Sequence, residues 1–367
     1  MDFVQDRITT IHHLSDQRPA SRQSSFAAIV PMLGRELEGG GAREVLQAID
    51  AVDPELIVVP VRADEAMIRS STWLVEEIEA PVEVLWCNAP GLDSHLKRLG
   101  LPGPGKGRDV WLATGIAATE AEVLGYIDAD IEGFTPTQVE RLISPIDASI
   151  AFSKGYYARV EDGRLYGRLF RLLIQPLIAA LQERNDHALL AYLDSFRYAL
   201  SGEFAVRADV VTGWSFPADM GLEIGLLGEG FRDLGFDGSA QVDLGFYRHD
   251  HRPVRGPNGL EGMAPEVIGA LADVIERHTD NAWSDEIEAT YLECANRLIE
   301  QYERDATGNG LDYDRSGERA QVERYRKAIR EPSRPEWLPP WSQVSLAPQE
   351  VRERSVAALS GVISSRE

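Results

Sequence analysis

Short apolar runs alternate with amphipathic stretches along the chain from about residue 26. The runs at 26–30, 56–59 and 82–87 have the length and the apolar content of buried strands. Between them, the stretches at 43–49 and 65–78 repeat apolar residues at helical spacing. This alternation predicts an α/β fold in which helices pack on a Rossmann-like, mostly parallel sheet.

The central part of the chain continues this pattern with longer elements. Strands are predicted at 123–127, 149–153, 200–206 and 240–246, and helices at 164–182 and 220–234. The helix predicted at 164–182 carries apolar residues on most of its faces, which indicates burial, and its Pro176 indicates a kink or a break.

Changes of pattern along the chain divide it into four parts. An N-terminal segment covers 1–25, a first α/β part covers 26–147, a second α/β part covers 148–262, and a helical C-terminal extension covers 263–367. Within the extension, the Pro- and Trp-rich stretch at 331–345 predicts an irregular arm on the surface.

Acidic residues outnumber basic ones by 59 to 37, which gives a formal net charge of −22. Such a surface disfavours binding to nucleic acids and to anionic membranes, because their phosphates would be repelled. The chain has only four lysines. Two explanations of the charge stay open: it keeps the protein in solution, or it is an acidic, halophilic-like surface suited to high salt.

The cysteines and the N-terminus bear on the compartment. Two cysteines are too few for a disulfide scaffold or a cysteine metal site. The first residues lack the basic start and the apolar stretch of a signal peptide, and no apolar run approaches the roughly 20 residues of a membrane span. We therefore expect a soluble, cytoplasmic protein.

Two aspartates follow the strand predicted at 123–127, in the order Asp128, Ala129, Asp130. Ligands of open α/β sheets bind beyond the carboxyl ends of the strands, where two carboxylates can hold a divalent cation such as Mg²⁺ or Mn²⁺. Such an ion would bind a diphosphate and offset its charge. The alternative is that one aspartate caps a turn and the other is solvated.

A Pro- and Gly-rich loop at 102–108 contains Gly105 and Lys106 and precedes a predicted helix. Its glycines allow a ligand to approach the backbone closely, and a helix N-terminus favours an anion. The spacing is not that of a Walker loop, because a glycine follows the lysine. A simple surface turn is the alternative.

Three further polar residues are candidates for chemistry. His249 and His251 lie two positions apart, so in an extended segment both side chains point to the same side, where one of them could complete a metal site. The alternative is a pair of surface histidines. Glu203 lies in an otherwise apolar predicted strand, where a carboxylate needs either a function or the partner of a buried ion pair.

In chain order these motifs resemble the glucosyl-3-phosphoglycerate synthases and their mannosyl relatives, which are retaining glycosyltransferases with the nucleotide-sugar-binding fold of the glycosyltransferase A type. The similarity extends to the related mannosylglycerate synthases. It is carried by PGKG at 104–107, DAD at 128–130, SKGYY at 153–157, QPLIAAL at 175–181, LSGEF at 200–204, GLEIGLL at 221–227, QVDLG at 241–245 and HDHRP at 249–253.

The resemblance implies a role for each matching residue. Lys106 would contact the donor diphosphate, and Asp128 would lie near the donor sugar and ribose. Asp130 and His249 would bind the divalent metal ion. Glu203 would lie near the reacting sugar, so Glu203 and Asp128 are the expected catalytic residues. The first α/β part would thus bind the donor, and the second would bind the acceptor and complete the metal site.

Other matching residues are expected to contact the two substrates. The remaining donor contacts would be Pro31, Leu33, Glu36, Gly105 and Ala129, and the acceptor contacts would be Arg164, Gly167, Arg168, His251 and Arg252. The guanidinium group of an arginine suits the phosphate or carboxylate of a glycerate acceptor. Together with Lys106, Arg248 and the metal ion, these arginines would concentrate positive charge in the cleft of an otherwise acidic protein.

The chain also departs from the family pattern. The family has PALNEE after its first strand, and this chain has PMLGRE at 31–36. Pro60 stands where the family has an aspartate that helps to read the nucleobase or its ribose, with Arg62 nearby. His251 replaces a family asparagine, and Tyr247 replaces a family arginine.

The function implied by the resemblance is that of a metal-dependent hexosyltransferase. It would transfer a hexose with retention from a nucleotide-diphosphate sugar to the 2-hydroxyl of 3-phosphoglycerate, towards a compatible solute, and it would act as a homodimer. UDP-glucose and GDP-mannose both stay open as donors, and phosphorylated and free glycerate as acceptors. Transfer to a different acceptor, such as a lipid or a growing glycan, also stays open, as does a non-catalytic nucleotide-sugar binder.

Overall fold

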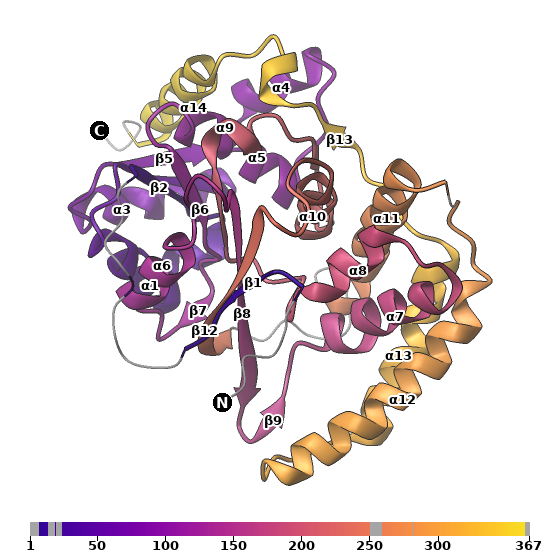
Figure 1. Ribbon diagram of the computed structural model, residues 1–367. Helices are drawn as coiled ribbons and strands as arrows, with labels where there is room; N and C mark the ends of the chain where they lie inside the picture. Colours follow the sequence, from indigo (N-terminus) through magenta and orange to yellow (C-terminus); the bar gives the residue numbers. More distant parts are fainter. Residues whose placement is uncertain (1–6, 14–18, 20–23, 250–258, 281, 364–367) are drawn as a thin grey trace.

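The computed structural model describes residues 7–13, 19, 24–249, 259–280 and 282–363, with only the backbone of 247–249 and 363. Within these residues eleven strands form one mixed sheet (Figure 1). The main path of the sheet runs through β1 (Thr9–Ile11), β12 (Ser239–His249), β8 (Phe152–Glu161), β10 (Phe204–Arg207), β6 (Val123–Tyr126), β2 (Phe26–Ile29), β4 (Leu56–Arg62) and β3 (Met32–Leu33). In addition, β5 (Val82–Trp86) pairs with β4, β7 (Ile131–Glu132) with β12, and β9 (Arg164–Leu165) with β8.

The sheet is parallel around β2, and along its main path one strand runs antiparallel to its neighbours. β2 runs parallel to β4 and β6, whereas β10 runs antiparallel to both β6 and β8. β2 and nearly all of β4 are buried, as expected where helices cover both faces of a parallel sheet. The sheet contains strands from both predicted α/β parts of the chain.

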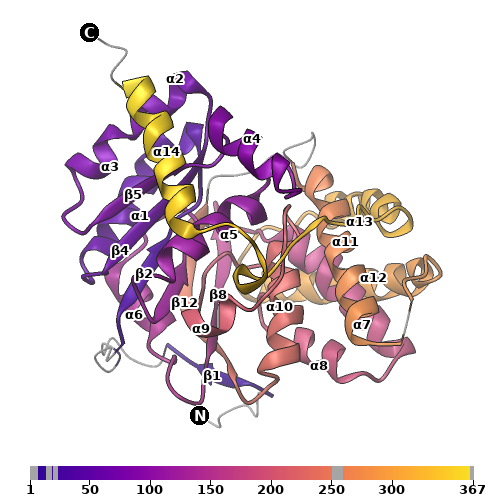
Figure 2. The same cartoon turned by 90° about the horizontal axis from the view of Figure 1, so that it is seen from above.

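The first α/β part contributes a group of helical elements around this sheet. They are α1 (Gly40–Asp50), α4 (Pro90–Arg98), α5 (Lys106–Ala117) and α6 (Pro136–Ile143), with the short elements η1 (Gly34–Glu38), α2 (Glu65–Ile68), η2 (Arg69–Thr72) and α3 (Trp73–Glu76). α5 is buried on nearly all sides, because it lies between β4 and the C-terminal helix α14 (Pro348–Ile363). Figure 2 shows α14 lying over this part of the molecule.

A second group of helices stands beside the sheet (Figure 1). It comprises α7 (Gln175–Arg184), α8 (Ala188–Ser195), α11 (Leu260–His278), α12 (Ile287–Gly308) and α13 (Arg315–Arg330). α12 packs against α7 and α13, and α10 (Leu222–Asp233) packs against α11. The short helix α9 (Ala208–Val211) follows β10. The predicted α/β fold with a helical C-terminal extension is therefore confirmed.

The predicted Pro- and Trp-rich arm joins the two helical groups. Its strand β13 (Trp337–Leu338) pairs with β11 (Phe216–Pro217), and the short helix η4 (Trp341–Gln343) follows. The ring of Trp341 stacks on that of Trp111 in α5 at 4.2 Å between centroids, and its indole N–H donates to the Trp111 carbonyl at 2.9 Å. Thus the chain returns from the extension to the first α/β part.

Residues 164–182 do not form the single helix expected from their pattern. Residues 164–165 are strand β9, and the helix begins only after Gly167, which has a φ of +73° that breaks regular structure. A π-helical turn, η3 (Phe170–Ile174), then leads into α7, with Pro176 in its first turn, where a missing N–H costs little. None of the described helices is both long and apolar enough to span a lipid bilayer.

Candidate active site

Two adjoining cavities open beyond the carboxyl end of β6. The first has a volume of about 430 Å³ and the second of about 120 Å³. Both are lined by Lys106, Asp128, Asp130, Met220 and Met263, so the three charged residues stand where the cavities meet. The lysine comes from the start of α5 and the aspartates from the end of β6, which is the arrangement expected for a ligand site in an open α/β sheet.

Lys106 is held between two carboxylates. Its Nζ lies 2.9 Å from Asp128 Oδ1 and 2.8 Å from Glu223 Oε1 of α10. Burial alone would lower the pKa of Lys106, but the charges of Asp128 and Glu223 more than reverse this and raise it. Lys106 is therefore a fixed positive charge at the junction of the cavities.

The N-terminus of α5 is tied to the segment before α10. The backbone N–H groups of Gly107 and Arg108 donate to the carbonyls of Asp219 and Ala218, at 3.2 and 3.1 Å. These bonds use the free N–H groups of the first helical turn. They fix the direction in which Lys106 leaves the helix.

Asp128 lies directly over the backbone of Gly202. A Cβ atom added at Gly202 would lie 2.1 Å from Asp128 Oδ2, so only glycine leaves room for the carboxylate. Gly202 lines the second cavity, whereas neighbouring Glu203 lines neither cavity. The structure thus places Glu203 behind the cavity wall.

The Glu203 side chain is completely buried, beside Tyr157. Burial and, next, the charge of Asp128 raise the pKa of Glu203 to about 8. Close to it, the buried Lys154 donates from Nζ to the Ser201 carbonyl at 2.8 Å. Burial lowers the pKa of Lys154 to about 8, although the carboxylates of Glu223 and Glu203 oppose this shift. The carboxylate of the segment predicted at 200–206 thus lies near a buried amine of the neighbouring strand β8.

Asp130 stands at the start of β7, which pairs with β12. Ile131 is directly opposite His249 in this pair, so the backbones of the two predicted metal ligands lie close together. The His249 side chain lies outside the described part of the structure, and the described side chains alone contain no group of three His, Cys, Asp or Glu residues arranged to hold a metal. His251 and Arg252, two predicted acceptor contacts, also lie outside the described residues.

Carboxylates crowd around Asp130. Burial raises the pKa of Glu36, and the charges of Asp130 and Asp128 add to this shift. Such crowded oxygen ligands suit a hard divalent cation, which would relieve their repulsion. These carboxylates are oxygen ligands of the kind that Mg²⁺ or Mn²⁺ takes, and His249 would have to complete such a site.

The predicted donor contacts line the first cavity. They are Pro31, Leu33, Glu36, Gly105 and Ala129. Glu36 accepts a hydrogen bond of 2.7 Å from the Leu33 backbone N–H, which fixes the loop after β2. Asp109, which no sequence motif singled out, also lines this cavity and pairs with Arg62 at 3.0 Å. Burial raises the pKa of Asp109 to about 6.

Two of the predicted acceptor contacts, Gly167 and Arg168, line the second cavity. Arg159 of β8 is a further cation on this wall. Sequence patterns did not indicate Arg159 because the predicted strand ended at residue 153, whereas β8 continues to Glu161. The structure does not bring Arg164 to either cavity: it lies in β9, in a groove on the other side of Arg168.

Comparison with known proteins gives long sequence matches. No family model matches the chain. It is 32% identical to the glucosyl-3-phosphoglycerate synthase of Methanococcoides burtonii over 397 residues, which covers 96% of each chain. It is 30% identical to the enzyme of the same name from Persephonella marina, covering 92% of this chain and 91% of that one.

Solved structures share the fold. The glucosyl-3-phosphoglycerate synthase of Mycobacterium tuberculosis, in complex with Mn²⁺, UDP-glucose and phosphoglyceric acid, superposes with a TM-score of 0.56. It is 25% identical in sequence, over 73% of this chain and 88% of that one. The mannosyl-3-phosphoglycerate synthase of Rubrobacter xylanophilus gives a TM-score of 0.54 at 22% identity, over 69% and 75%, which shows a common fold only.

Proposed function

Because this chain belongs to the glucosyl-3-phosphoglycerate synthase family, we propose that it transfers glucose from UDP-glucose to the 2-hydroxyl of 3-phosphoglycerate. The observation that carries this proposal is the pair of adjoining cavities with Lys106, Asp128 and Asp130 at their junction. A donor in one cavity and an acceptor in the other would meet at these residues. Catalysis by such a site rests largely on holding the two reactants in the reactive geometry.

The donor would occupy the first cavity with its diphosphate next to Lys106. The ammonium group, fixed by Asp128 and Glu223, would then donate to a phosphate oxygen as negative charge develops on the leaving UDP. Asp128 would hold hydroxyl groups of the glucose or the ribose. Pro31, Leu33 and Glu36 would form the wall against the nucleoside.

The acceptor would occupy the second cavity, where Arg159 and Arg168 add to the charge of Lys106. 3-Phosphoglycerate carries a phosphate and a carboxylate, and the planar, many-donor guanidinium group binds both kinds of anion well. Two anionic groups also explain why two arginines stand on one small cavity. We propose that Arg168 binds one of these groups.

Asp130 and His249 would hold a divalent cation. The structure of the Mycobacterium tuberculosis enzyme contains Mn²⁺, which supports this proposal. When bound, the cation would offset charge on the diphosphate. Transfer with retention breaks the bond between glucose C1 and the diphosphate and forms a bond from C1 to the acceptor oxygen. The acceptor proton would pass to the leaving diphosphate, and Glu203, which is buried and lines neither cavity, would not act as a nucleophile.

The test is a matrix of donors and acceptors. Purified protein is incubated with UDP-glucose or GDP-mannose, with 3-phosphoglycerate or glycerate, and with Mn²⁺ or Mg²⁺. We expect UDP release and glucosyl-3-phosphoglycerate from one pair, UDP-glucose with 3-phosphoglycerate. Activity with GDP-mannose alone would replace the proposal by a mannosyltransferase, and donor binding without turnover in any pair would replace it by a nucleotide-sugar binder.

A matched pair of arginine variants tests the acceptor site. Arg168→Met should raise the KM for 3-phosphoglycerate by at least tenfold, because a bound anion loses a charged partner worth about 1.5–3 kcal/mol. Arg98→Met, on the exposed end of α4, should leave it unchanged. Light scattering of the wild-type protein would test whether it forms the homodimer that the resemblance implies.

A further inference from the structure

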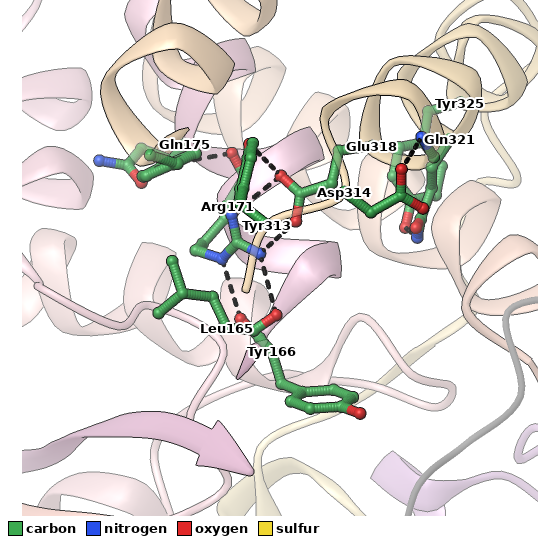
Figure 3. A network of polar contacts seen from close by, with 11 residues as sticks. Leu165, Tyr166, Arg171, Gln175, Tyr313, Asp314, Glu318, Gln321 and Tyr325 are labelled. Atoms are coloured by element: carbon green, nitrogen blue, oxygen red, sulfur yellow. Dashed lines mark hydrogen bonds and ion pairs between the residues drawn. The ribbon is translucent and has the colours of Figure 1, made fainter. Parts of the chain in front are cut away.

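Arg171 lies one helical turn after Arg168, on the π-helical turn η3. Its side chain turns back to the chain that precedes it (Figure 3). Nε donates to the Tyr166 carbonyl at 2.9 Å, and Nη2 points to the Leu165 carbonyl at 3.4 Å. One guanidinium group thus holds two successive carbonyls of the segment that leads into Gly167 and Arg168.

The other edge of this guanidinium binds the C-terminal extension. Glu318 of α13 accepts from Nη2 at 2.7 Å and from Nη1 at 3.2 Å, in a two-pronged contact. The Tyr313 hydroxyl donates to the same carboxylate at 2.5 Å. Figure 3 shows these groups converging on Glu318. The Arg171 and Glu318 side chains are only 13% and 9% exposed, so the pair is shielded from solvent.

The backbone held by Arg171 forms one wall of the second cavity. Tyr166, Gly167, Arg168 and Leu169 all line that cavity. Gly167 adopts a φ of +73°, outside regular helix and strand geometry, and the backbone bonds at this turn are those from the Arg171 N–H to the Gly167 carbonyl at 3.0 Å and from the Tyr166 N–H to the Arg159 carbonyl at 2.8 Å. The direction of Arg168 therefore depends on what holds the turn from behind.

We propose that the Arg171–Glu318 pair is a positioning device for the acceptor, through which the C-terminal extension holds the 166–168 turn and so aims Arg168 into the second cavity. The inference rests on the proposed function, because it takes an anionic acceptor for that cavity. It assigns to α13, far along the chain from the motifs of the site, a part in acceptor binding.

The choice of an ion pair supports this role. A buried ion pair seldom stabilises a fold more than apolar side chains of the same size would. What an apolar contact cannot supply is donors aimed at the carbonyls of Leu165 and Tyr166. Glu318 satisfies the remaining edge of the guanidinium, so these donors stay in one orientation. The π-helical turn, a geometry often found next to functional sites, sets Arg171 in place for both contacts.

Glu318→Gln is the decisive variant, and Glu288→Gln is its matched control. Glu288, on α12, bonds Arg326 and Arg330 of α13 and is 11% exposed, close to the value for Glu318. It thus holds the same helix with the same chemistry, but its two partners lie on α13 and not on the 165–168 segment. Three quantities are measured for each variant: the KM for 3-phosphoglycerate, kcat, and the Kd for UDP.

We expect Glu318→Gln to raise the KM for 3-phosphoglycerate about tenfold, with kcat and the Kd for UDP within twofold of wild type. Glu288→Gln should leave all three unchanged, even where both variants lower Tm by a similar amount. Tyr313→Phe, which removes one hydrogen bond to Glu318, should raise the same KM about threefold and serves if Glu318→Gln does not fold. Equal effects on KM in Glu318→Gln and Glu288→Gln, or an unchanged KM in both Glu318 and Tyr313 variants, would overturn the inference.

Hydrogen exchange separates this inference from the proposed function. If the wild-type protein transfers glucose to no acceptor, the proposed function fails. The positioning role is then judged by amide exchange of a peptide covering 163–169, which should be at least fivefold faster in Glu318→Gln than in wild type and unchanged in Glu288→Gln. Equal exchange rates in all three proteins would refute the positioning role itself.

Discussion

Replacing Lys106 by methionine tests whether the junction of the two cavities is a tightly coupled charge cluster. Lys106 Nζ lies within 3 Å of Asp128 and Glu223, and the lysine and Glu223 side chains are 14% and 7% exposed. At an effective dielectric constant of about 20, each contact supplies about 6 kcal/mol of direct attraction. Desolvation of the three groups cancels most of this while the cluster is intact.

Lys106→Met removes the attraction but leaves two partly buried carboxylates facing each other. We therefore expect the free energy of unfolding at pH 7 to fall by about 3 kcal/mol, the usual cost of removing one partner of a buried ion pair. Adding Glu223→Gln removes one of the two stranded charges, so the double variant should regain about 1.5 kcal/mol. The Kd for UDP should rise at least tenfold in both proteins, because neither has the ammonium group.

Urea denaturation and calorimetric titration with UDP provide the two measurements. Lys97→Met is the control: Lys97 is 62% exposed and pairs with Asp93 one turn away in α4, so its loss should cost less than about 0.5 kcal/mol. Purely additive effects of Lys106→Met and Glu223→Gln on stability would refute the coupling. Recovery of UDP binding in the double variant would refute the role of Lys106 at the diphosphate.

Three further changes have definite expected outcomes. Gly202→Ala would set a Cβ 2.1 Å from Asp128 Oδ2, so kcat/KM should fall at least about 100-fold with an unchanged circular dichroism spectrum; turnover within threefold of wild type would contradict this. Glu203 keeps its proton in the fold up to about pH 8 but loses it near pH 4.5 when unfolded, so stability should fall as pH rises between these values by up to about 1.4 kcal/mol per unit. In metal-free buffer, the stability of Glu203→Gln should lack this dependence on pH. If the free energies of unfolding of Glu203→Gln and wild type change with pH in parallel, the prediction is wrong. Trp341→Ala loses the stack on Trp111 and should lower the free energy of unfolding by about 3 kcal/mol in urea; a loss below about 1 kcal/mol would show that the arm is not anchored there.

The sequence predicted the elements that are buried on both sides and missed those that depend on a distant partner. β2 and β4 are apolar along nearly all of their length, so their own residues are enough to predict them as buried strands. β1 is three residues long and is a strand only because β12 offers it an edge. α14 follows a Pro-rich arm and packs on α4 and β5, which lie more than 250 residues earlier. Local pattern carries no information about such contacts.

The same distinction holds at the site. Lys106, Asp128 and Asp130 were predictable because a helix N-terminus and a strand end supply them at one edge of a sheet. Glu223 was not, since it reaches Lys106 only through the packing of α10. Glu203 was expected near the reacting sugar, and in the structure its neighbour Gly202 lines the second cavity whereas Glu203 itself does not. Whether a side chain such as Glu203 lines a cavity or lies behind its wall depends on tertiary packing, and the spacing of residues in the sequence does not show it.

The described side chains of the first cavity are mainly acidic, whereas positive charge was expected to gather in the cleft; the side chains of Arg248 and Arg252, two of the expected cations, lie outside the described part of the structure. Among the described residues, the first cavity is lined by three basic side chains, Arg35, Arg62 and Lys106, and six acidic ones, Glu36, Asp109, Asp128, Asp130, Asp219 and Glu266. Burial raises the pKa of Asp219 to about 6, as it does for Asp109. The second cavity is balanced, with Lys106, Arg159 and Arg168 against Asp128, Asp130 and Glu223.

A diphosphate entering so acidic a cavity is repelled unless cations enter with it. We therefore expect UDP to bind at least tenfold more tightly in Mn²⁺ than in EDTA, a difference of about 1.4 kcal/mol. Asp130→Asn should remove most of this difference, whereas Asp162→Asn, in the turn between β8 and β9, should preserve it. Molar KCl should reduce the difference in UDP affinity between Mn²⁺ and EDTA only slightly, because salt screens exposed charges far more than buried ones. Equal UDP affinity in Mn²⁺ and in EDTA would mean that Lys106 and the arginines alone outweigh six carboxylates, and the electrostatic reasoning for the cation would fail.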